Sequence, residues 1–119
     1  MSVVTGPLQR LAGELRGCRG AFTMDYDGLT LEVLRPPAGE DLDAIGAEMA
    51  AVLREARQAA QDLGLGPLRG VSVRADGATL IFREAEREYL LVALLDRAAG
   101  AAAARRALAE AARDEPTAP

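Results

Sequence analysis

The sequence has no histidine, lysine, asparagine or tryptophan, and it contains a single cysteine. Without histidine, the chain lacks the commonest general base and the commonest transition-metal ligand. Cys18 has no second cysteine for an internal disulfide and no histidine with which to form a nucleophilic pair. We therefore interpret Cys18 as a small apolar side chain of the core. We also predict that the protein is not an enzyme and holds no metal or cofactor.

Aromatic residues are scarce, since the chain has only two phenylalanines and two tyrosines. Half of the residues are apolar, and most of these are alanine, leucine or valine. The core must therefore be built from aliphatic side chains that pack closely. A chain of 119 residues suffices for one domain with its own core. We predict a single domain over residues 1–113 and a flexible tail over residues 114–119.

All fourteen positive residues are arginine, and the formal net charge is −4. An acidic total with scattered arginines argues against a nucleic-acid partner. The adjacent Arg105 and Arg106 are interpreted as the solvated face of a helix. No stretch approaches the ~20 apolar residues that a membrane span needs, and the start of the sequence lacks the apolar region of a signal peptide. We therefore expect a cytoplasmic protein without a membrane span.

Hydrophobic spacing predicts two helices and two strands in the first half of the chain. An opening helix follows Gly6-Pro7 and carries an apolar face that ends at Cys18. Short strands are predicted over residues 21–24 and 29–33, joined by a hairpin turn. The longest element is a helix over residues 41–63. Its predicted apolar face comprises Leu42, Ile45, Met49, Val52, Leu53, Ala56, Ala60 and Leu63.

The second half of the chain predicts three strands and a closing helix. The strands cover residues 68–75, 79–83 and 89–95, with a charged connection over residues 84–88. The last strand is apolar on both sides, so it belongs at the centre of a covered sheet. Asp96 is placed to cap an alanine-rich final helix. The order α-β-β-α-β-β-β-α predicts an α+β fold, with an antiparallel sheet and helices on both of its faces.

Three short motifs suggest chemistry, and each has a simpler structural interpretation. Asp25 and Asp27 with Gly28 resemble the start of a calcium loop, but Pro36 stands at the twelfth position, where that loop needs a glutamate. The glycines of residues 64–67 follow a helix and precede no lysine, so they end the helix and do not hold phosphate. The three glutamates of residues 84–88 are interpreted as a solvated turn.

The order of these features resembles the roadblock/dynein-light-chain family, including its bacterial MglB-like regulators. The resemblance covers residues 7–112 and includes Gly20-Ala21-Phe22, Asp27-Gly28-Leu29, the long helix and the apolar strand over residues 89–95. It implies a five-stranded antiparallel sheet between one long helix and two terminal helices. It also implies a homodimer in which the third strands pair edge to edge and the long helices pack side by side. The dimer-interface residues that it implies are Ala44, Ala47, Ala51, Val71 and Val73. The three alanines also form a stripe of small residues beside the large apolar face of the long helix.

For function, the resemblance implies a non-catalytic homodimeric adaptor or regulator of a small Ras-like GTPase, with activation of the GTPase as one form of that regulation. The alternative is a secretion-chaperone-like dimer that binds an extended client segment. A small-molecule sensor or an enzyme with a pocket under the sheet is the third hypothesis. It is the weakest of the three, because histidine is missing and serine and cysteine are scarce.

Overall fold

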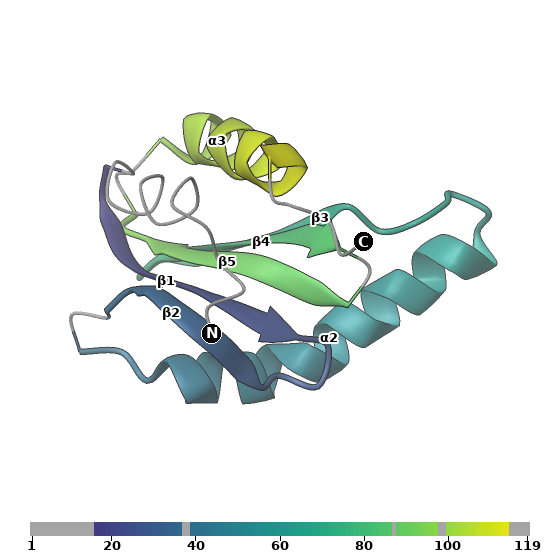
Figure 1. The fold of residues 1–119 in the computed structure, drawn as a ribbon, viewed down its shortest axis with the longest axis horizontal. Helices are drawn as coiled ribbons and strands as arrows, with labels where there is room; N and C mark the ends of the chain where they lie inside the picture. Colours follow the sequence, from purple (N-terminus) through teal and green to yellow (C-terminus); the bar gives the residue numbers. More distant parts are fainter. Residues whose placement is uncertain (1–15, 37–38, 87, 98–99, 115–119) are drawn as a thin grey trace.

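The computed structural model describes residues 16–36, 39–86, 88–97 and 100–114 (Figure 1). These residues form an antiparallel sheet in the order β2-β1-β5-β4-β3, with helices α2 and α3 on opposite sides. The elements are β1 (Cys18–Asp25), β2 (Thr30–Arg35), α2 (Leu42–Asp62), β3 (Gly70–Arg74), β4 (Thr79–Glu86), β5 (Tyr89–Leu95) and α3 (Ala101–Asp114). The predicted α+β fold is confirmed. Most of the predicted opening helix and residues 115–119 of the predicted tail lie outside the described residues, whereas Asp114 is the last residue of α3.

Strand β5 is the centre of the sheet, as its doubly apolar sequence predicted. All seven of its residues are buried, and it pairs with β1 on one side and β4 on the other. Because its side chains alternate between the two faces, they join two separate layers of the core. The sheet therefore needs a cover on both faces.

Each face of the sheet has its own cluster of buried side chains, and each cluster includes residues of one helix. The α3 side comprises Cys18, Ala21, Ile81, Tyr89, Leu91, Ala93, Leu95, Ala104, Leu108 and Ala112. The α2 side comprises Phe22, Met24, Tyr26, Leu42, Leu53, Phe82, Leu90 and Val92. Helix α3 contributes Ala104, Leu108 and Ala112 to its cluster. These residues recur every fourth position and therefore lie on one face of the helix.

The turn between β1 and β2 confirms the predicted hairpin. Asp25 Oδ1 accepts hydrogen bonds from the backbone N–H groups of Asp27 and Leu29, at 2.9 and 3.0 Å. Gly28 has a φ of 88°, in the left-handed region that favours glycine. The Asp25 carboxylate thus closes the turn, which is the role that the hairpin interpretation gave to this motif in place of a calcium loop.

Three predictions for residues in or next to strands differ from the structure. Cys18 is the first residue of β1 and pairs with Leu95, so its assignment to a helix face was wrong. The positive φ of Gly17 precedes it and is incompatible with a continuing helix. Strand β4 runs to Glu86, so Glu84 lies in the sheet and not in a solvated turn. Helix α3 begins at Ala101, too far along the chain for Asp96 to cap it.

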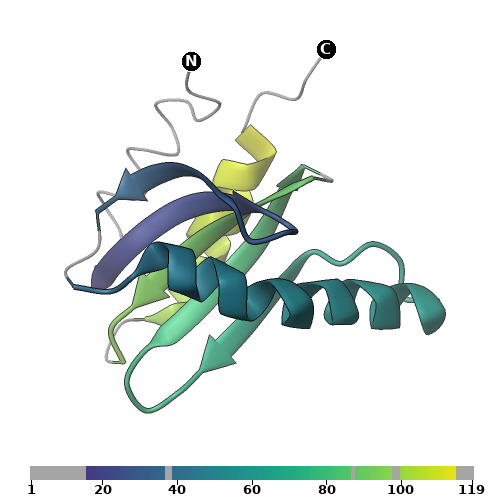
Figure 2. The ribbon, with the colours of Figure 1, turned by 90° about the horizontal axis from the view of Figure 1, so that it is seen from below.

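Helix α2 has the predicted bounds, with Asp41 as its N-cap and Leu63 as its C-cap. Its predicted apolar face is only partly correct, because Val52 is 48% exposed and Leu63 is 72% exposed. The buried residues of α2 end at Leu53, and the rest of the helix runs past the sheet (Figure 2). Only the first part of α2 therefore belongs to the core. No helix among the described residues combines the length and the apolar character that crossing a membrane requires.

Candidate interaction surface

The small-residue stripe of α2 is exposed to solvent. Ala44, Ala47 and Ala51 are all exposed, and their spacing of three and four places them on one side of the helix. Alanine presents little side chain, so a second helix can approach the backbone closely there. Val52 adds a large exposed apolar side chain next to this stripe. The stripe is thus an apolar surface that the described residues leave open.

Strand β3 lies at an edge of the sheet and pairs only with β4 within the described residues. Val71 and Val73 are half-buried and pack against the α2-side cluster. The other side of the strand presents backbone N–H and C=O groups that none of the described strands uses. Such an edge invites pairing with another chain unless something covers it.

A hollow of about 500 Å³ lies between the first turns of α2 and the β3–β4 hairpin. Ala44 and Ile45 line it from the helix, and Val73 and Leu80 line it from the strands. Residues from both halves of the predicted interface therefore meet in one cavity. We call Ala44, Ala47, Ala51, Val71 and Val73 the interface set.

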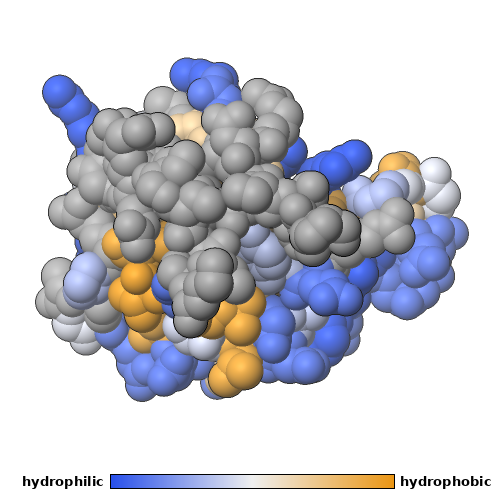
Figure 3. Space-filling view, viewed as in Figure 1, coloured by the Kyte–Doolittle hydropathy of each residue, from blue (hydrophilic) through white to orange (hydrophobic). Residues whose placement is uncertain are grey.

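A second exposed apolar surface follows β2, the strand at the opposite edge. Leu29, Leu31 and Val33 are between 43% and 65% exposed. Figure 3 shows apolar side chains gathered over this part of the sheet. The resemblance did not point to these residues, and their alternation in the sequence predicted only a strand.

Helix α2 is held in place by a polar cluster at the end of β1. Arg54 Nη1 donates to the backbone oxygen of Tyr26 at 2.7 Å, and the Arg57 guanidinium lies over the Tyr26 ring, 4.4 Å from its centroid. The Tyr26 hydroxyl donates to Glu84 Oε2 at 2.5 Å. Burial raises the pKa of Tyr26, the hydrogen bond and the charge of Glu84 raise it further, and Arg57 opposes them.

A second cluster fastens the start of α2 to the β3–β4 hairpin. The Arg19 guanidinium pairs with Glu40 just before the helix and lies 3.5 Å from Asp96 Oδ1 after β5. It also donates to the backbone oxygen of Gly77 at 3.3 Å. One side chain of β1 thus joins three segments that surround the hollow at the interface set.

The titratable groups of the described residues form no constellation with an evident catalytic role. Glu84 is engaged with Tyr26, and the buried Cys18 Sγ donates to the backbone oxygen of Gly20 at 3.3 Å. Among the described residues, no group of three or more histidine, cysteine, aspartate or glutamate side chains is arranged to hold a metal ion. The surfaces that stand out are apolar or charged and suited to contacts with other proteins.

The fold is that of a small α+β domain with helices on both faces of a five-stranded antiparallel sheet. The sequence profile of the Roadblock/LC7 domain matches residues 6–95. The chain therefore belongs to the Roadblock/LC7 family. Among curated protein sequences, no match is found.

Solved structures with the same fold cover nearly the whole chain. A Roadblock/LC7 domain from Streptomyces avermitilis is 24% identical, with a TM-score of 0.75 over 91% of this chain and 90% of that one. Myxococcus xanthus MglB is 12% identical, with a TM-score of 0.77 over 92% and 91%. The gliding protein MglB from Thermus thermophilus is 24% identical, with a TM-score of 0.68 over 91% and 87%. At these identities the similarity shows the fold.

Proposed function

We propose that this protein is a non-catalytic homodimeric adaptor that regulates a small Ras-like GTPase in the cytoplasm. The observation that carries the proposal is the open apolar surface of the interface set on a Roadblock/LC7 domain. Structural neighbours that are MglB proteins support the regulatory part, and one of them is described as having a tetrameric arrangement.

The dimer is supported by what a second copy would cover. Pairing of the β3 edges would satisfy the free backbone groups of both edges and extend the sheet across two chains. The same pairing would bring the alanine stripes of two α2 helices together. The side chains of Ala44 and Val73 line one hollow, so a second copy would fill it while it covers the stripe. One contact thus removes the exposed edge and the exposed stripe together.

Regulation by binding is supported by the kind of side chains that the surfaces carry. The exposed part of α2 beyond Leu53 presents Arg54 and Arg57, which are anchored through Tyr26 and are therefore held in fixed positions. Anchored arginines on a rigid helix suit recognition of a folded partner, since little side-chain freedom is lost on binding. A client that binds as an unfolded strand would require an apolar groove longer than the hollow lined by Ala44 and Val73.

The experiment is a binding assay between the purified protein and a Ras-like GTPase encoded by the same genome. The GTPase is loaded with GDP or with a GTP analogue, and complex formation is followed by size-exclusion chromatography with light scattering. We expect a complex in at least one nucleotide state. Absence of a complex in both states contradicts the GTPase proposal. Capture of an extended, unstructured segment in place of the folded GTPase would support the secretion-chaperone alternative.

A further inference from the structure

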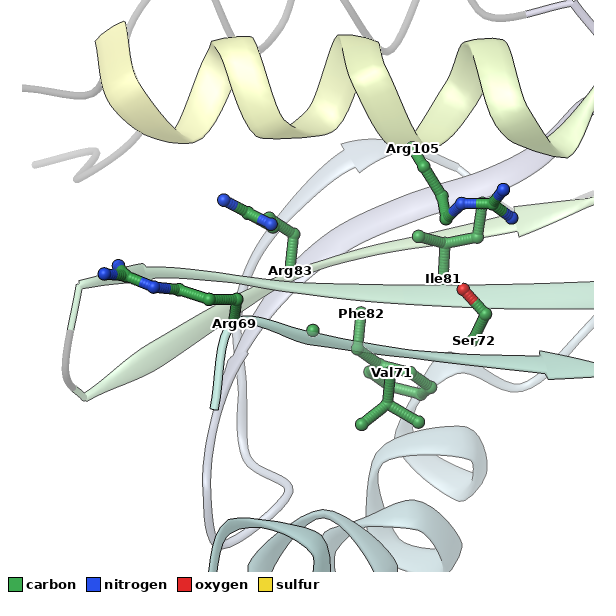
Figure 4. Close-up of a pocket in the computed structure, with 8 residues that line it drawn as sticks. Arg69, Val71, Ser72, Ile81, Phe82, Arg83 and Arg105 are labelled. Carbon is green, nitrogen blue, oxygen red and sulfur yellow. The ribbon is translucent and has the colours of Figure 1, made fainter. Parts of the chain in front are cut away.

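A hollow of about 280 Å³ lies on the α3 side of the sheet, over strands β3 and β4 (Figure 4). Three arginines from three different segments line it: Arg69 before β3, Arg83 on β4 and Arg105 on α3. The strands also supply Gly70, Val71, Ser72, Ile81 and Phe82 to the lining. In a chain with a net charge of −4, this concentration of positive charge stands out from the rest of the sequence.

The positive charges of this arginine hollow lack partners among the described residues. No described carboxylate forms an ion pair with Arg69, Arg83 or Arg105. Arg83 Nε is buried and has no hydrogen-bond partner there. A buried donor without an acceptor costs free energy, and an acceptor supplied from outside would remove that cost. The hollow is therefore suited to a ligand with negative charge.

The arrangement of the arginines indicates the shape of that ligand. Figure 4 shows Arg69 and Arg83 toward one end of the hollow, and Arg105 with Ser72 and Ile81 toward the other. A single phosphate is best held by donors that converge on one point. Donors at two ends fit a chain with several carboxylates, because alternate residues of an extended segment lie about 7 Å apart on the same side.

We infer that the arginine hollow binds an acidic segment of a partner polypeptide, with carboxylates paired to Arg83 and Arg105. The hollow lies beside α3, and its lining includes Val71 of the interface set, so a ligand there would lie next to the β3 edge. The inference does not depend on the identity of the GTPase. Guanidinium groups bind carboxylates through paired hydrogen bonds, so the arginines give orientation as well as charge.

The test measures binding of a fluorescent peptide of alternating glutamate and serine by fluorescence anisotropy. The control is an uncharged peptide of the same length in which glutamine replaces each glutamate. We expect saturable binding of the acidic peptide that weakens as salt increases, and no binding of the control peptide. Arg105→Ala is expected to weaken binding about tenfold, as the loss of one charge-assisted contact would. Arg83→Gln should have an effect of similar size.

Arg106→Ala is the matched control, because Arg106 is the exposed neighbour of Arg105 on α3 and does not line the hollow. It should leave the affinity within about twofold of the wild type, since only distant charge is removed. Arg105 is also exposed, so its replacement should leave thermal unfolding unchanged. If Arg83→Gln does not fold, the affinity of Arg105→Ala for the acidic peptide tests the inference alone. Equal losses for Arg105→Ala and Arg106→Ala, or tighter binding of inorganic phosphate than of the peptide, would overturn the inference.

Discussion

The backbone of Gly28 in the β1–β2 turn lies directly against the backbone of Gly46 in α2. A Cβ atom placed on Gly46 would lie 2.5 Å from the carbonyl oxygen of Gly28, and one placed on Gly28 would lie 2.6 Å from the carbonyl oxygen of Gly46. Real Cβ atoms essentially never approach backbone oxygens so closely. The two glycines therefore set how near the helix comes to the sheet, and with it the position of the alanine stripe.

Gly46→Ala should destabilise the protein, although alanine favours a helix by about 1 kcal/mol over glycine. The added methyl group must push α2 away from the turn, and overpacking of this kind costs about 1–3 kcal/mol. We expect a lower free energy of unfolding in urea. Gly77→Ala is the control, because a Cβ there meets nothing within 4 Å and the φ of Gly77 is not positive. A Gly46→Ala protein as stable as the wild type would show that the contact is not tight.

Tyr26→Phe should lower stability at neutral pH by about 1–2 kcal/mol, because it leaves the Glu84 carboxylate without its donor. The pKa of Tyr26 is raised above its ordinary value of about 10 in the folded state. The contribution of the Tyr26 hydroxyl to the free energy of unfolding is therefore complete below about pH 10 and is lost as the pH rises through the raised pKa. The stability difference between wild type and variant should shrink above about pH 10. A difference that stays constant there contradicts the account.

Two further variants test the causes of this pKa shift separately. Glu84→Gln removes the negative charge and should lower the pKa of Tyr26, whereas Arg57→Ala removes the opposing positive charge and should raise it. The chain has two tyrosines and no tryptophan, so the ultraviolet absorbance of the phenolate reports these titrations directly. Shifts of the same sign in both variants would show that the ring does not lie between these two charges.

Arg19→Ala should destabilise the protein by about 1 kcal/mol, more than an ordinary surface charge contributes. The substitution leaves Glu40 without its cation, and one oxygen of Glu40 is already buried without a hydrogen bond among the described residues. Thermal unfolding measures the loss. Arg16→Ala, at an exposed position just before β1, is the control and should change little. Equal melting temperatures for the two variants would mean that the Arg19 contacts contribute nothing.

The sequence predicted the sheet best where a pattern had only one structural solution. The unbroken apolar run of β5 required burial on both faces, and β5 is the central strand. Hydrophobic periodicity was less reliable for burial, because it identifies the apolar face of a helix but not the element that covers this face. Leu63 is exposed because the end of α2 runs past the sheet (Figure 2). Val52 is also exposed, although its neighbour Leu53 is fully buried. Glu84 was assigned to a turn because its charge suggested solvent, and a distant tyrosine supplies its partner.

The candidate surfaces were harder to predict, because they are formed by residues that are far apart in the sequence. The alanine stripe is visible in the spacing of α2, but its meeting with Val73 at one hollow is not. The close contact of Gly28 and Gly46 also leaves no local signal, since glycine serves many purposes in a turn or a helix. The arginine hollow draws its charges from three separate segments, so the sequence shows only scattered arginines.

The mass of the protein in solution tests most directly whether two copies join through the interface set. We expect sedimentation equilibrium to give twice the 12.5 kDa of one chain for the wild type, and the mass of one chain for Ala47→Arg, which places a charge in the stripe. Ala102→Arg, the same change at an exposed position of α3, should remain a dimer. A wild type with the mass of a single chain, or an Ala47→Arg protein that stays dimeric, would contradict the account.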